Sequence, residues 1–450
     1  MVSEQSFRTA AWYGDEILKM DFPHEWDIRC LWPRTPSPLT EEEIVDTLEH
    51  PTGQPPISEI CRGKSRPLVI VDDLNRPTPA ARVMRPLLRI LRDGGTSARQ
   101  VKILMATGAH GVPRKNAMIK KVGPEAASSC RTIVHDCTRD LVEVGRTSFG
   151  TPVIVNRAVA LSDFVIGIGG IYPNQTAGFG GGSKLALGVL GERSIMHLHF
   201  RHESVGWGSS AKSNFRRDLD EIARLIGLNT MVSVHLNSDR EIVRMRCGDP
   251  SCYFEDEIAF SKKTYLAPMP ENTDVVVSNA YPNDLSLTFV LMKGITPLLH
   301  CRPEVTTIAV GSCSEGMGYH RLFPVTSSPM LHQLSARARR LSAMTPRELL
   351  DRTCSRFLRS FSLDGLRRGK PFLRRERPSE KNPIWLYRTQ KSDEPLPSEV
   401  RRARVKSLWS EVLQVVKREQ GDTKHLRILV YPCAPLQHLL PDTGSERQSS

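Results

Sequence analysis

Short apolar runs alternate with helical patterns in the first part of the chain. The run PLVIVDD at 67–73 predicts a buried strand that ends in a polar turn. RVMRPLLRILRDGG at 82–95 places apolar residues about three or four positions apart, which predicts a helix that ends before glycine. VKILMATGAH at 101–110 predicts a second strand, and TPVIVNRAVALSDFVIGIGG at 151–170 predicts a third and a fourth. Strands that alternate with helices favour parallel βαβ units.

A second region of the same kind begins near residue 266. Three segments predict strands followed by loops, namely DVVVSNAYPNDLS at 274–286, VTTIAVGSCSEGMG at 305–318 and HLRILVYPCAP at 425–435. PLPSEVRRARVKSLWSEVLQVVKREQG at 395–421 predicts one helix that is entered after proline. The alternation of strands and helices again favours a parallel sheet.

We therefore expect an α/β protein with two lobes, mainly parallel sheets and an active-site cleft between the lobes. The first α/β domain should span residues 1–265, and the second should span residues 266–440. An Arg-rich elaboration at 333–410 should belong to the second domain, and residues 441–450 should form a disordered tail.

Composition narrows the class of protein. Hydrophobic residues make up 39% of the 450 residues and charged residues 25%, which is close to globular averages and excludes wholesale disorder. No stretch approaches the ~18 apolar residues of a membrane span, and the start, MVSEQSFRTAAWYGDEILKM, lacks the apolar core of a secretory signal. The ten cysteines show no CxxC spacing and predict neither a structural zinc site nor a disulfide scaffold. We expect a cytoplasmic protein that does not bind a membrane.

The net charge of +13 comes almost entirely from one segment. Residues 333–410 hold 20 Lys and Arg against 8 Asp and Glu. Three interpretations stay open for this segment: a solvated surface whose arginine stems cover apolar neighbours, a face that binds a polyanion, or a surface for an anionic substrate or membrane. No zinc-finger spacing or aromatic RNA-binding strand is present, so nucleic acid is not an expected partner.

Polar clusters follow the predicted strands of the first domain. Ligands bind outside the carboxyl ends of parallel strands, so these clusters mark the expected site. One of them ends in the glycine-rich sequence GFGGGSK at 178–184. A Walker A phosphate loop needs Ser or Thr after its lysine, whereas Leu185 follows Lys184 here. The motif instead predicts a loop whose backbone can approach a ligand closely and which ends in one lysine. The clusters are Asp72–Arg76, Thr107–His110 and Tyr172–Lys184.

Several motifs in this order resemble the nickel-dependent lactate racemase family. They are YGDE at 13–16, VDDLNRPTP at 71–79, ATGAH at 106–110, HDCTRDLVEVG at 135–145, GIYPNQTAGFGGGSK at 170–184 with a histidine fifteen residues later, and NAYPNDLSLTFVLMKG at 279–294. The resemblance runs from Tyr13 to the VYPCAP segment near residue 430 and is weakest across 320–400.

The resemblance implies a cofactor and a set of residues that hold it. The family's cofactor is a nickel-pincer nucleotide, pyridinium-3,5-bisthiocarboxylic acid mononucleotide, whose sulfur-containing arms hold nickel. Lys184 matches the lysine that is joined to this cofactor through a thioamide, and His199 matches the nickel ligand, with His197 as the alternative. Enzymes that make the cofactor are therefore implied partners. The residues that match the cofactor-binding segments are Asp72, Asp73, Asn75 and Arg76 near the phosphate, and Gly181 and Gly182 in the glycine-rich loop.

The resemblance also implies a reaction, the racemisation or epimerisation of a small-molecule 2-hydroxyacid. His110 matches the acid/base histidine, and Lys293 matches the lysine that contacts the substrate carboxylate. Removing the C2 hydrogen as hydride avoids a carbanion beside a carboxylate, and a neutral histidine can take the hydroxyl proton near pH 7. Taken alone, Lys293 could instead be a helix-end lysine, and Arg76 could pair with a neighbouring carboxylate.

Besides Asn75, which replaces the usual threonine, three positions depart from the family pattern. Asn174 stands where the family has a second catalytic histidine, Phe289 stands where a tyrosine is usual, and Gly170 stands where a histidine is common. Asparagine can form hydrogen bonds but cannot shuttle protons near neutral pH. We keep Asn174 as a site residue and expect a 2-hydroxyacid other than lactate.

The missing histidine leaves two explanations open. Another residue could serve as the second base, with His202, Tyr172 and Asp284 as unranked candidates. Alternatively, the chain could bind its ligand without two-sided turnover, as a catalytically reduced member of the family. A third possibility is that the basic segment 333–410 binds a polyanion.

Overall fold

The computed structural model describes one long stretch of the chain, with small gaps, and four shorter ones. The described residues are 2–323 except 112, 115, 210, 211 and 229, together with 383–390, 396–400, 402–421 and 425–440. The predicted tail at 441–450 and most of the basic segment 333–410 lie outside these residues.

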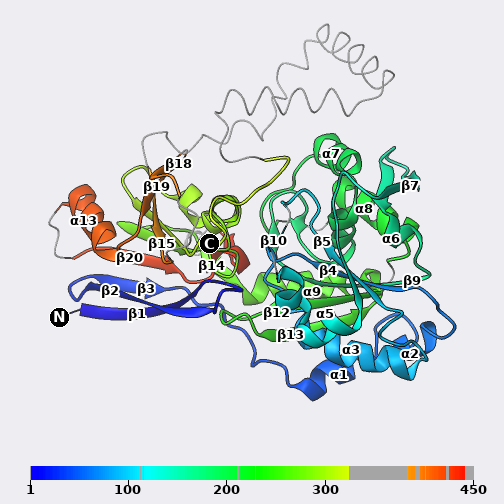
Figure 1. Cartoon of the computed structure of the whole chain (residues 1–450). Coiled ribbons are helices and arrows are strands. Elements are labelled where there is room, and N and C mark those ends of the chain that lie inside the picture. Colours follow the sequence, from blue (N-terminus) through cyan, green and yellow to red (C-terminus); the bar gives the residue numbers. More distant parts are fainter. Residues whose placement is uncertain are drawn as a thin grey trace, which may run out of the picture.

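Two large sheets organise the described chain, and Figure 1 shows them side by side. The first sheet has the order β13-β12-β9-β4-β5-β6, and its strands are parallel except for the β12–β13 pair. Its strands are β4 (Pro67–Asp72), β5 (Lys102–Ala106), β6 (Arg131–Val134), β9 (Phe164–Gly170), β12 (Thr230–Leu236) and β13 (Ile242–Gly248). Most of this part of the chain is therefore a parallel α/β unit, as the sequence predicts.

The second sheet has the order β18-β19-β17-β16-β15-β20-β3. All of its neighbouring pairs are parallel except β18–β19. Its strands are β3 (Asp27–Cys30), β15 (Val275–Asn279), β16 (Thr306–Gly311), β17 (Ile384–Arg388), β18 (Glu399–Val400), β19 (Ala403–Lys406) and β20 (Arg427–Tyr431). The predicted α/β class with mainly parallel sheets is confirmed in both regions.

Helices and short helical turns connect and cover these strands. Their bounds are α1 (Glu41–Glu49), α2 (Ile57–Ile60), α3 (Ala81–Asp93), α4 (Ala117–Val122), α5 (Pro124–Ser129), α6 (Arg157–Ala160), η1 (Gly182–Val189), α7 (Glu192–Arg201), α8 (Asn214–Leu225), η2 (Pro250–Cys252), α9 (Phe254–Thr264), α10 (Leu287–Phe289), η3 (Val290–Gly294), η4 (Pro297–His300), α13 (Trp409–Gln420) and η6 (Ala434–Leu436). The predicted helix at 82–95 corresponds to α3, and Gly95 after its end takes a φ of 91°.

Four short strand pairs complete the described structure. Three are antiparallel: β1 (Val2–Thr9) with β2 (Glu16–Pro23), β7 (Leu141–Arg146) with β8 (Pro152–Asn156), and β10 (Pro173–Asn174) with β11 (Gly178–Phe179). The fourth, β14 (Leu266–Pro268) with β21 (His438–Leu440), is parallel.

Strand β4 shows why its sequence is an unbroken apolar run. All six of its residues are buried. Leu68 and Ile70 pack in the core with α7 and α8, whereas Val69 and Val71 pack on the other face with α3. Successive side chains of a strand point to opposite faces, so a strand that is covered on both faces needs apolar residues throughout.

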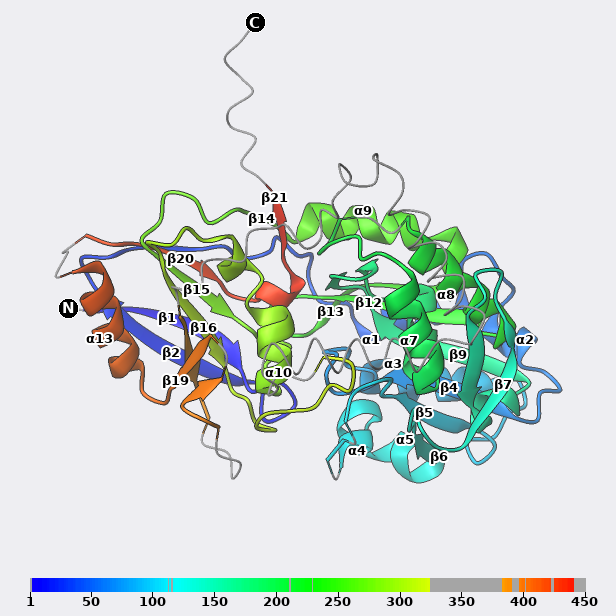
Figure 2. The same ribbon diagram turned by 90° about the horizontal axis from the view of Figure 1, so that it is seen from above.

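The second sheet is covered in a similar way, but one cover comes from the start of the chain. Val276 packs with residues of α10 and η4 on one face. Val275 and Val277 pack on the other face with α13 and the β1–β2 hairpin, which contributes Met20 and Phe22. Figure 2 shows the hairpin and α13 together at the same end of the molecule.

Three expectations from the sequence need correction. Strand β3 pairs with β20 in the second sheet, so the boundary of 1–265 for the first domain is wrong at its beginning. Strand β8 forms a hairpin with β7 instead of joining the parallel sheet. The predicted helix at 395–421 is helical only from Trp409, because Val400, Ala403 and Val405 alternate with arginines and form β18 and β19.

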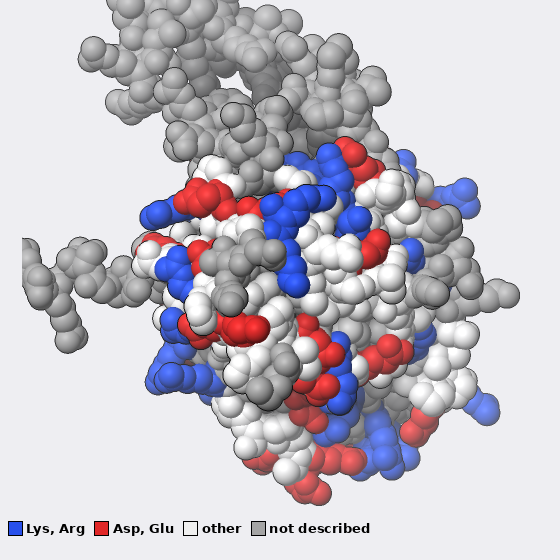
Figure 3. Space-filling view, turned by 90° about the vertical axis from the view of Figure 1, so that its left-hand side faces the viewer, with Lys and Arg blue, Asp and Glu red and all other residues white. Residues whose placement is uncertain are grey.

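In the described part of the chain, no helix is both long enough and apolar enough to cross a membrane. On the face shown in Figure 3, lysine and arginine side chains lie among aspartate and glutamate side chains.

Candidate active site

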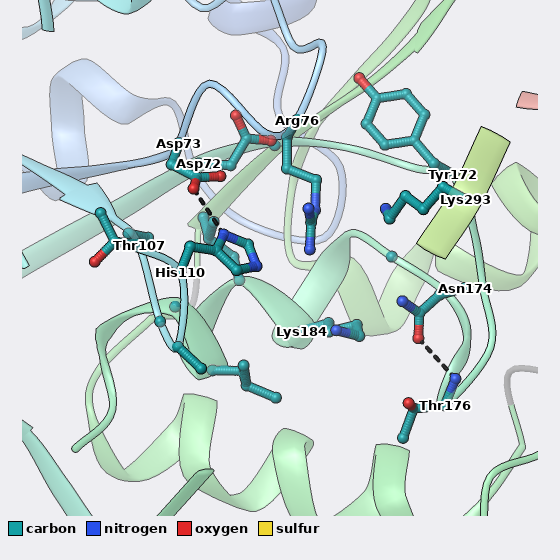
Figure 4. Close-up of a pocket in the computed structure, with 18 of the residues that line it drawn as sticks. Asp72, Asp73, Arg76, Thr107, His110, Tyr172, Asn174, Thr176, Lys184 and Lys293 are labelled. Carbon is teal, nitrogen blue, oxygen red and sulfur yellow. Dashed lines mark hydrogen bonds and ion pairs between the residues drawn. The ribbon is translucent and has the colours of Figure 1, made fainter. Parts of the chain in front are cut away.

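A pocket lies where the carboxyl ends of β4, β5 and β9 face the α10–η3 segment that follows β15. The space between its walls, including solvent at its mouth, is about 1040 Å³. Figure 4 shows side chains from these elements pointing into it. Nine of the predicted site residues line the pocket: Asp72, Asp73, Arg76, His110, Asn174, Gly181, Lys184, His199 and Lys293.

Asn75 and Gly182 are the two predicted cofactor contacts that the structure does not bring to this pocket. The side-chain amide of Asn75 donates a hydrogen bond to Oδ2 of Asp73 at 2.7 Å, so Asn75 supports a site residue instead of lining the site. Gly182 faces the opposite side of its loop, where a Cβ would lie 3.1 Å from the ring of Phe254.

His110 and Asp73 form a buried pair at one side of the pocket. Nδ1 of His110 lies 2.7 Å from Oδ2 of Asp73. The carboxylate is an acceptor, so Nδ1 carries the proton and Nε2 keeps its lone pair in the neutral ring. Burial lowers the pKa of His110 below its usual 6.5, although Asp73 opposes this shift. For Asp73 burial opposes ionisation, but His110, Arg76 and Asn75 hold its pKa at about 2. A neutral histidine oriented by a carboxylate is suited to act as a base.

Asp72 has a different partner, the buried Lys121. The ammonium group of Lys121 donates to Oδ1 of Asp72 at 2.8 Å and to the carbonyl oxygens of Arg76 and Thr78 at 3.0 and 3.1 Å. The hydroxyl of Thr78 donates to Oδ2 of Asp72 at 2.6 Å. These bonds close the loop after β4 and fix its shape. Sequence reasoning missed Lys121, because nothing in the helix sequence AMIKKV separates it from Lys120.

Arg76 is directed into the pocket (Figure 4). Among the described residues, its guanidinium donates one hydrogen bond, to the carbonyl of Asn75 at 3.0 Å. Asp72 and Asp73 pair with Lys121 and His110 instead. The alternative of an Arg76 salt bridge to either aspartate is therefore not observed in this part of the chain, and Arg76 can receive an anionic group.

The glycine-rich loop places Lys184 in the middle of the pocket. Gly181 has a φ of 78°, and an added Cβ there would lie 2.7 Å from the side chain of Ile171. Only glycine fits this turn without strain. Burial, together with the positive charges of Arg76 and Arg216, lowers the pKa of Lys184 to about 7. Its amine is therefore partly uncharged and nucleophilic at neutral pH.

His199, on α7, is the histidine of its stretch that reaches the pocket. Its Nδ1 lies 2.8 Å from the carbonyl oxygen of Ile195, so Nδ1 donates and Nε2 is left as a potential ligand atom. Burial lowers the pKa of His199 to about 4, which keeps the ring neutral as a metal ligand requires. His197 and His202 do not line the pocket and instead bond to Thr151 and Asp218.

Asn174 lies on the opposite side of Lys184 from His110 (Figure 4). Its side-chain oxygen accepts hydrogen bonds from the backbone N–H groups of Thr176 and Ala177 at 3.0 and 2.9 Å. The oxygen is occupied by the turn, so Asn174 can offer only its amide N–H₂ to a ligand. It cannot replace the acid/base function of a histidine.

None of the three candidates for a second base fits that role. Tyr172 lines the pocket, but its hydroxyl lies 3.1 Å from the hydroxyl of Thr78 and burial raises its pKa well above 10. His202 is paired with Asp218 outside the pocket. Asp284 is buried, and its carboxylate accepts hydrogen bonds from the backbone N–H groups of Ala10, Ala11 and Ser312.

The second sheet contributes Lys293 and Phe289 through the α10–η3 segment. Burial and the nearby charges of Arg76 and Lys184 lower the pKa of Lys293 well below 10.5. The ring of Phe289 lies edge-on to His110, with centroids 4.9 Å apart. Phe289 therefore places an apolar surface beside His110.

The Gly170 departure has a local explanation. An added Cβ at Gly170 would overlap the phenol ring of Tyr172. The tyrosine thus occupies the space that a larger side chain at position 170 would need.

His320 is a pocket residue that sequence reasoning missed. It follows β16 in the loop SCSEGMGYH, and its ring centroid lies 5.3 Å from that of His110. The signal was present, because loops at the carboxyl ends of parallel strands are where ligands bind. None of the family motifs includes this loop, so none of them drew attention to it.

Comparison with known proteins supports the resemblance seen in the sequence. A family model described as the lactate racemase N-terminal domain matches residues 13–209. The lactate racemase of Lactiplantibacillus plantarum is 29% identical over 302 residues, which cover 64% of this chain and 70% of that protein. The lactate racemase of Thermoanaerobacterium thermosaccharolyticum is 26% identical over 350 residues, covering 73% of this chain and 80% of that protein.

Solved structures share the fold. The lactate racemase apoprotein from Thermoanaerobacterium thermosaccharolyticum superimposes with a TM-score of 0.68 at 21% identity, covering 97% of this chain and 100% of that chain. A protein from Thermotoga maritima matches with a TM-score of 0.56 at 15% identity, covering 90% of this chain and 100% of that chain. Together with the family model, the sequence matches support the assignment of the chain to the lactate racemase family, and the solved structures support the same fold.

Proposed function

We propose that this protein racemises or epimerises a 2-hydroxyacid with a nickel-pincer nucleotide joined to Lys184, and that its preferred substrate is not lactate. The observation that carries the proposal is the convergence of the His110–Asp73 pair, Lys184 and His199 on one pocket. The names of the two curated relatives, both lactate racemases, support an isomerase of this class.

The residues present fit such a cofactor. Within the described ranges, no group of three or more His, Cys, Asp or Glu side chains could hold a metal ion by itself. His199 offers a single imidazole nitrogen, so a metal bound there needs other donors, and soft sulfur donors on a cofactor suit nickel. Lys184 supplies an amine with a pKa of about 7, which can form an amide-type bond at neutral pH.

His110 carries the proton transfer of the proposed reaction. When bound, the cofactor supplies an acceptor and donor for the C2 hydrogen of the substrate, which passes with its electron pair. At the same time, Nε2 of His110 takes the proton from the substrate hydroxyl, and Asp73 stabilises the imidazolium that forms. The oxidised substrate is a planar 2-ketoacid, and returning hydrogen to its other face inverts C2.

The charge of the pocket suits an anionic substrate. Arg76 and Lys293 line it beside Lys184, while Asp72 and Asp73 are paired with Lys121 and His110. Once Lys184 is joined to the cofactor, its nitrogen is uncharged, so Arg76 and Lys293 are the groups that can receive a carboxylate. A carboxylate bound there would favour the charged form of Lys293, which burial and the nearby positive charges disfavour.

Two side chains support a substrate other than lactate. Phe289 offers no hydroxyl where it faces His110, and Asn174 can hold an oxygen atom but cannot transfer a proton. An apolar face beside the base suits a 2-hydroxyacid with a larger apolar substituent than a methyl group. Cofactor-making enzymes are required partners in this proposal, and the cytoplasmic location stays a prediction.

The test is to express the chain together with cofactor-making enzymes and to measure intact mass and nickel content. We expect an added mass and about one nickel per chain, with both lost in Lys184→Ala and both kept in Lys19→Ala. Lys19 is a surface lysine paired with Glu4 and serves as the matched control. The loaded protein is then incubated with each enantiomer of lactate, 2-hydroxybutyrate, 2-hydroxyisocaproate and malate, and the products are separated on a chiral column.

The outcomes separate the candidate functions. Conversion of a larger acid faster than lactate supports the proposal. A loaded protein that binds an acid without converting any of them favours the ligand-binding alternative. An unmodified, metal-free chain, with a known lactate racemase loaded in parallel, would contradict the proposed cofactor.

A further inference from the structure

We propose that His320 is a second functional imidazole of the pocket, which donates a hydrogen bond from Nε2 to the C2 oxygen of the substrate. This inference rests on the proposed function, because the oxygen belongs to the 2-hydroxyacid. His320 would act beside His110 and would not take a proton itself.

The backbone fixes His320 next to His110. The two residues form an antiparallel bridge, and the N–H of Arg321 donates to the carbonyl oxygen of Ala109 at 2.8 Å. Arg321 also pairs with Glu192 at 2.7 Å, which ties this loop to the start of α7. The loop after β16 in the second sheet is thereby held against the loop after β5 in the first sheet.

Aromatic contacts hold the ring of His320. Its centroid lies 5.3 Å from that of His110 and 5.1 Å from that of Phe323. Phe289 lies near both histidines, with centroids 4.9 Å from His110 and 6.3 Å from His320. Only 8% of His320 is exposed, and the residue lines the pocket. The two imidazoles therefore lie next to each other against the same apolar ring.

The hydrogen bonds of His320 fix which nitrogen carries its proton. Nδ1 accepts from the backbone N–H groups of Leu322 and Phe323, at 3.3 and 3.2 Å. A nitrogen that accepts cannot carry the proton, so the neutral ring carries it on Nε2. Among the described residues, Nε2 has no hydrogen-bonding partner.

His110 has the opposite arrangement. Its Nδ1 donates to Asp73, which leaves Nε2 as an acceptor. The pocket thus presents one acceptor nitrogen and one donor nitrogen from adjacent rings. A hydroxyl group donates one hydrogen bond and accepts others, so it matches this pair. We assign the C2 hydroxyl of the substrate to the two histidines.

The same pair serves both states of the substrate. When the hydroxyl proton passes to Nε2 of His110, the oxygen becomes a carbonyl oxygen and still accepts from Nε2–H of His320. When the proton returns from His110, the original hydroxyl is restored. Protonating His320 would require breaking its backbone contacts at Nδ1 beside a charged His110. His320 therefore polarises the oxygen throughout and leaves proton transfer to His110.

This arrangement also bears on the asparagine at position 174, where the family has a histidine. His110 and Asn174 lie on opposite sides of the pocket, and His320 lies on the side of His110. Both enantiomers must then direct their C2 oxygen to the histidine side. The departure at Asn174 is compatible with turnover, because one side of the pocket holds both the base and the donor.

The test uses the cofactor-loaded enzyme with His320→Leu, His320→Gln, His110→Gln and the surface control His50→Gln. His50 is exposed and pairs with Asp46, far from the pocket. We expect His320→Leu to lower kcat by about 100-fold with little change in KM, as for removal of one donor to a developing oxyanion. His320→Gln keeps an N–H donor and should recover to within about 10-fold of wild type.

A second readout does not depend on turnover. In protein labelled with ¹⁵N-histidine, the imidazole nitrogen shifts report which nitrogen of each ring is protonated. We expect the proton of His320 on Nε2 and that of His110 on Nδ1. A His320 proton on Nδ1 would overturn the proposal. Thermal melts of the variants identify any that fail to fold, and His320→Gln then carries the test.

The outcomes distinguish the two levels of inference. If the loaded wild type converts an acid but His320→Leu keeps kcat within twofold of it, the role of His320 is wrong and the proposed function stands. Loss of the added mass or nickel in both folded His320 variants would also overturn the role, because it would assign His320 to cofactor binding. If the loaded wild type converts none of the acids, the proposed function and the role of His320 fail together.

Discussion

Asp73 and His110 meet across two neighbouring parallel strands, with Oδ2 of Asp73 2.7 Å from Nδ1 of His110. Asp73 directly follows β4, and His110 lies four residues beyond β5. The carboxyl ends of these strands meet at one edge of the sheet, so two short polar loops form a histidine–carboxylate pair, to which the proposed function assigns the base and the group that orients it.

Replacing Asp73 by asparagine should disable the base without emptying the pocket. An amide at this position can donate to Nδ1, which favours the wrong tautomer of His110. We expect the loaded Asp73→Asn enzyme to lose at least about 100-fold in kcat. The exposed substitution Asp93→Asn is the control. An Asp73→Asn enzyme with wild-type kcat would show that the reaction does not need Asp73 to orient His110.

The pH dependence of the reaction follows from the same pair. In the proposed reaction neutral His110 takes the hydroxyl proton, and burial places its pKa below 6.5. The rate of substrate oxidation should therefore rise with pH through an acidic midpoint and level off near neutrality. Asp73 raises the pKa of His110, so any residual activity of Asp73→Asn should have its midpoint at lower pH. A midpoint that moves to higher pH would contradict this assignment.

Lys121 should contribute more to the free energy of unfolding than a surface lysine does. It is fully buried, and its ammonium group bonds to Asp72 and to two backbone carbonyls of the same loop. Lys121→Met leaves Asp72 without its charged partner and should cost about 3 kcal/mol of unfolding free energy.

Chemical denaturation of Lys121→Met, Asp72→Asn and the double variant tests this pairing. Removing the charge of Asp72 as well should recover part of the loss, so the double variant should be more stable than Lys121→Met alone. Lys120→Met, at the neighbouring position, is the control for a lysine that is not tied to Asp72. Strictly additive losses would mean that the two side chains do not stabilise each other.

Much of this site could be predicted from the sequence, because most of its residues lie in short motifs next to predicted strands. Asp72, Arg76, His110 and Lys184 belong to short motifs that directly follow strands of one parallel sheet. Lys293 comes from the second sheet, but a motif marks it. His320 and Lys121 have no motif, and their positions depend on how distant segments pack.

The errors have the same origin. Strand β3 is separated from β20 by about four hundred residues of sequence, and no local pattern reveals that pairing. The segment 399–406 alternates apolar and charged residues, a pattern that the surrounding helical propensity concealed. Asn75 occupies a motif position, but its side chain donates a hydrogen bond to Asp73 and does not line the pocket.

Lys184 should show unusual reactivity even without cofactor. Its pKa of about 7 means that half of its amines are uncharged at neutral pH. Trace acetylation of the apoprotein with acetic anhydride between pH 6 and 9, read by peptide mass spectrometry, should give a half-maximal rate near pH 7. Arg76→Gln removes a positive charge that lowers this pKa, so the midpoint should rise. Arg139→Gln, at an exposed position, should leave it unchanged. A rate that is still rising at pH 9 in the wild type would contradict the shift.

Asn174→His would restore the second histidine of the family pattern. It tests whether a group on this side of the pocket can exchange a proton with the substrate. The amide oxygen of Asn174 accepts two backbone hydrogen bonds, and losing them should cost about 1 kcal/mol of stability. In the wild type, proton exchange on the His110 side alone would give the rates of both reaction directions the same pH dependence.

The variant adds an acid/base group on the opposite side of the pocket. The pH profile of the rate in one direction should therefore gain a second titration. Asn174→Ala removes the same cap without adding a base and should show the stability loss alone. Identical pH profiles for Asn174→His and Asn174→Ala would mean that the opposite side of the pocket cannot exchange protons with the substrate.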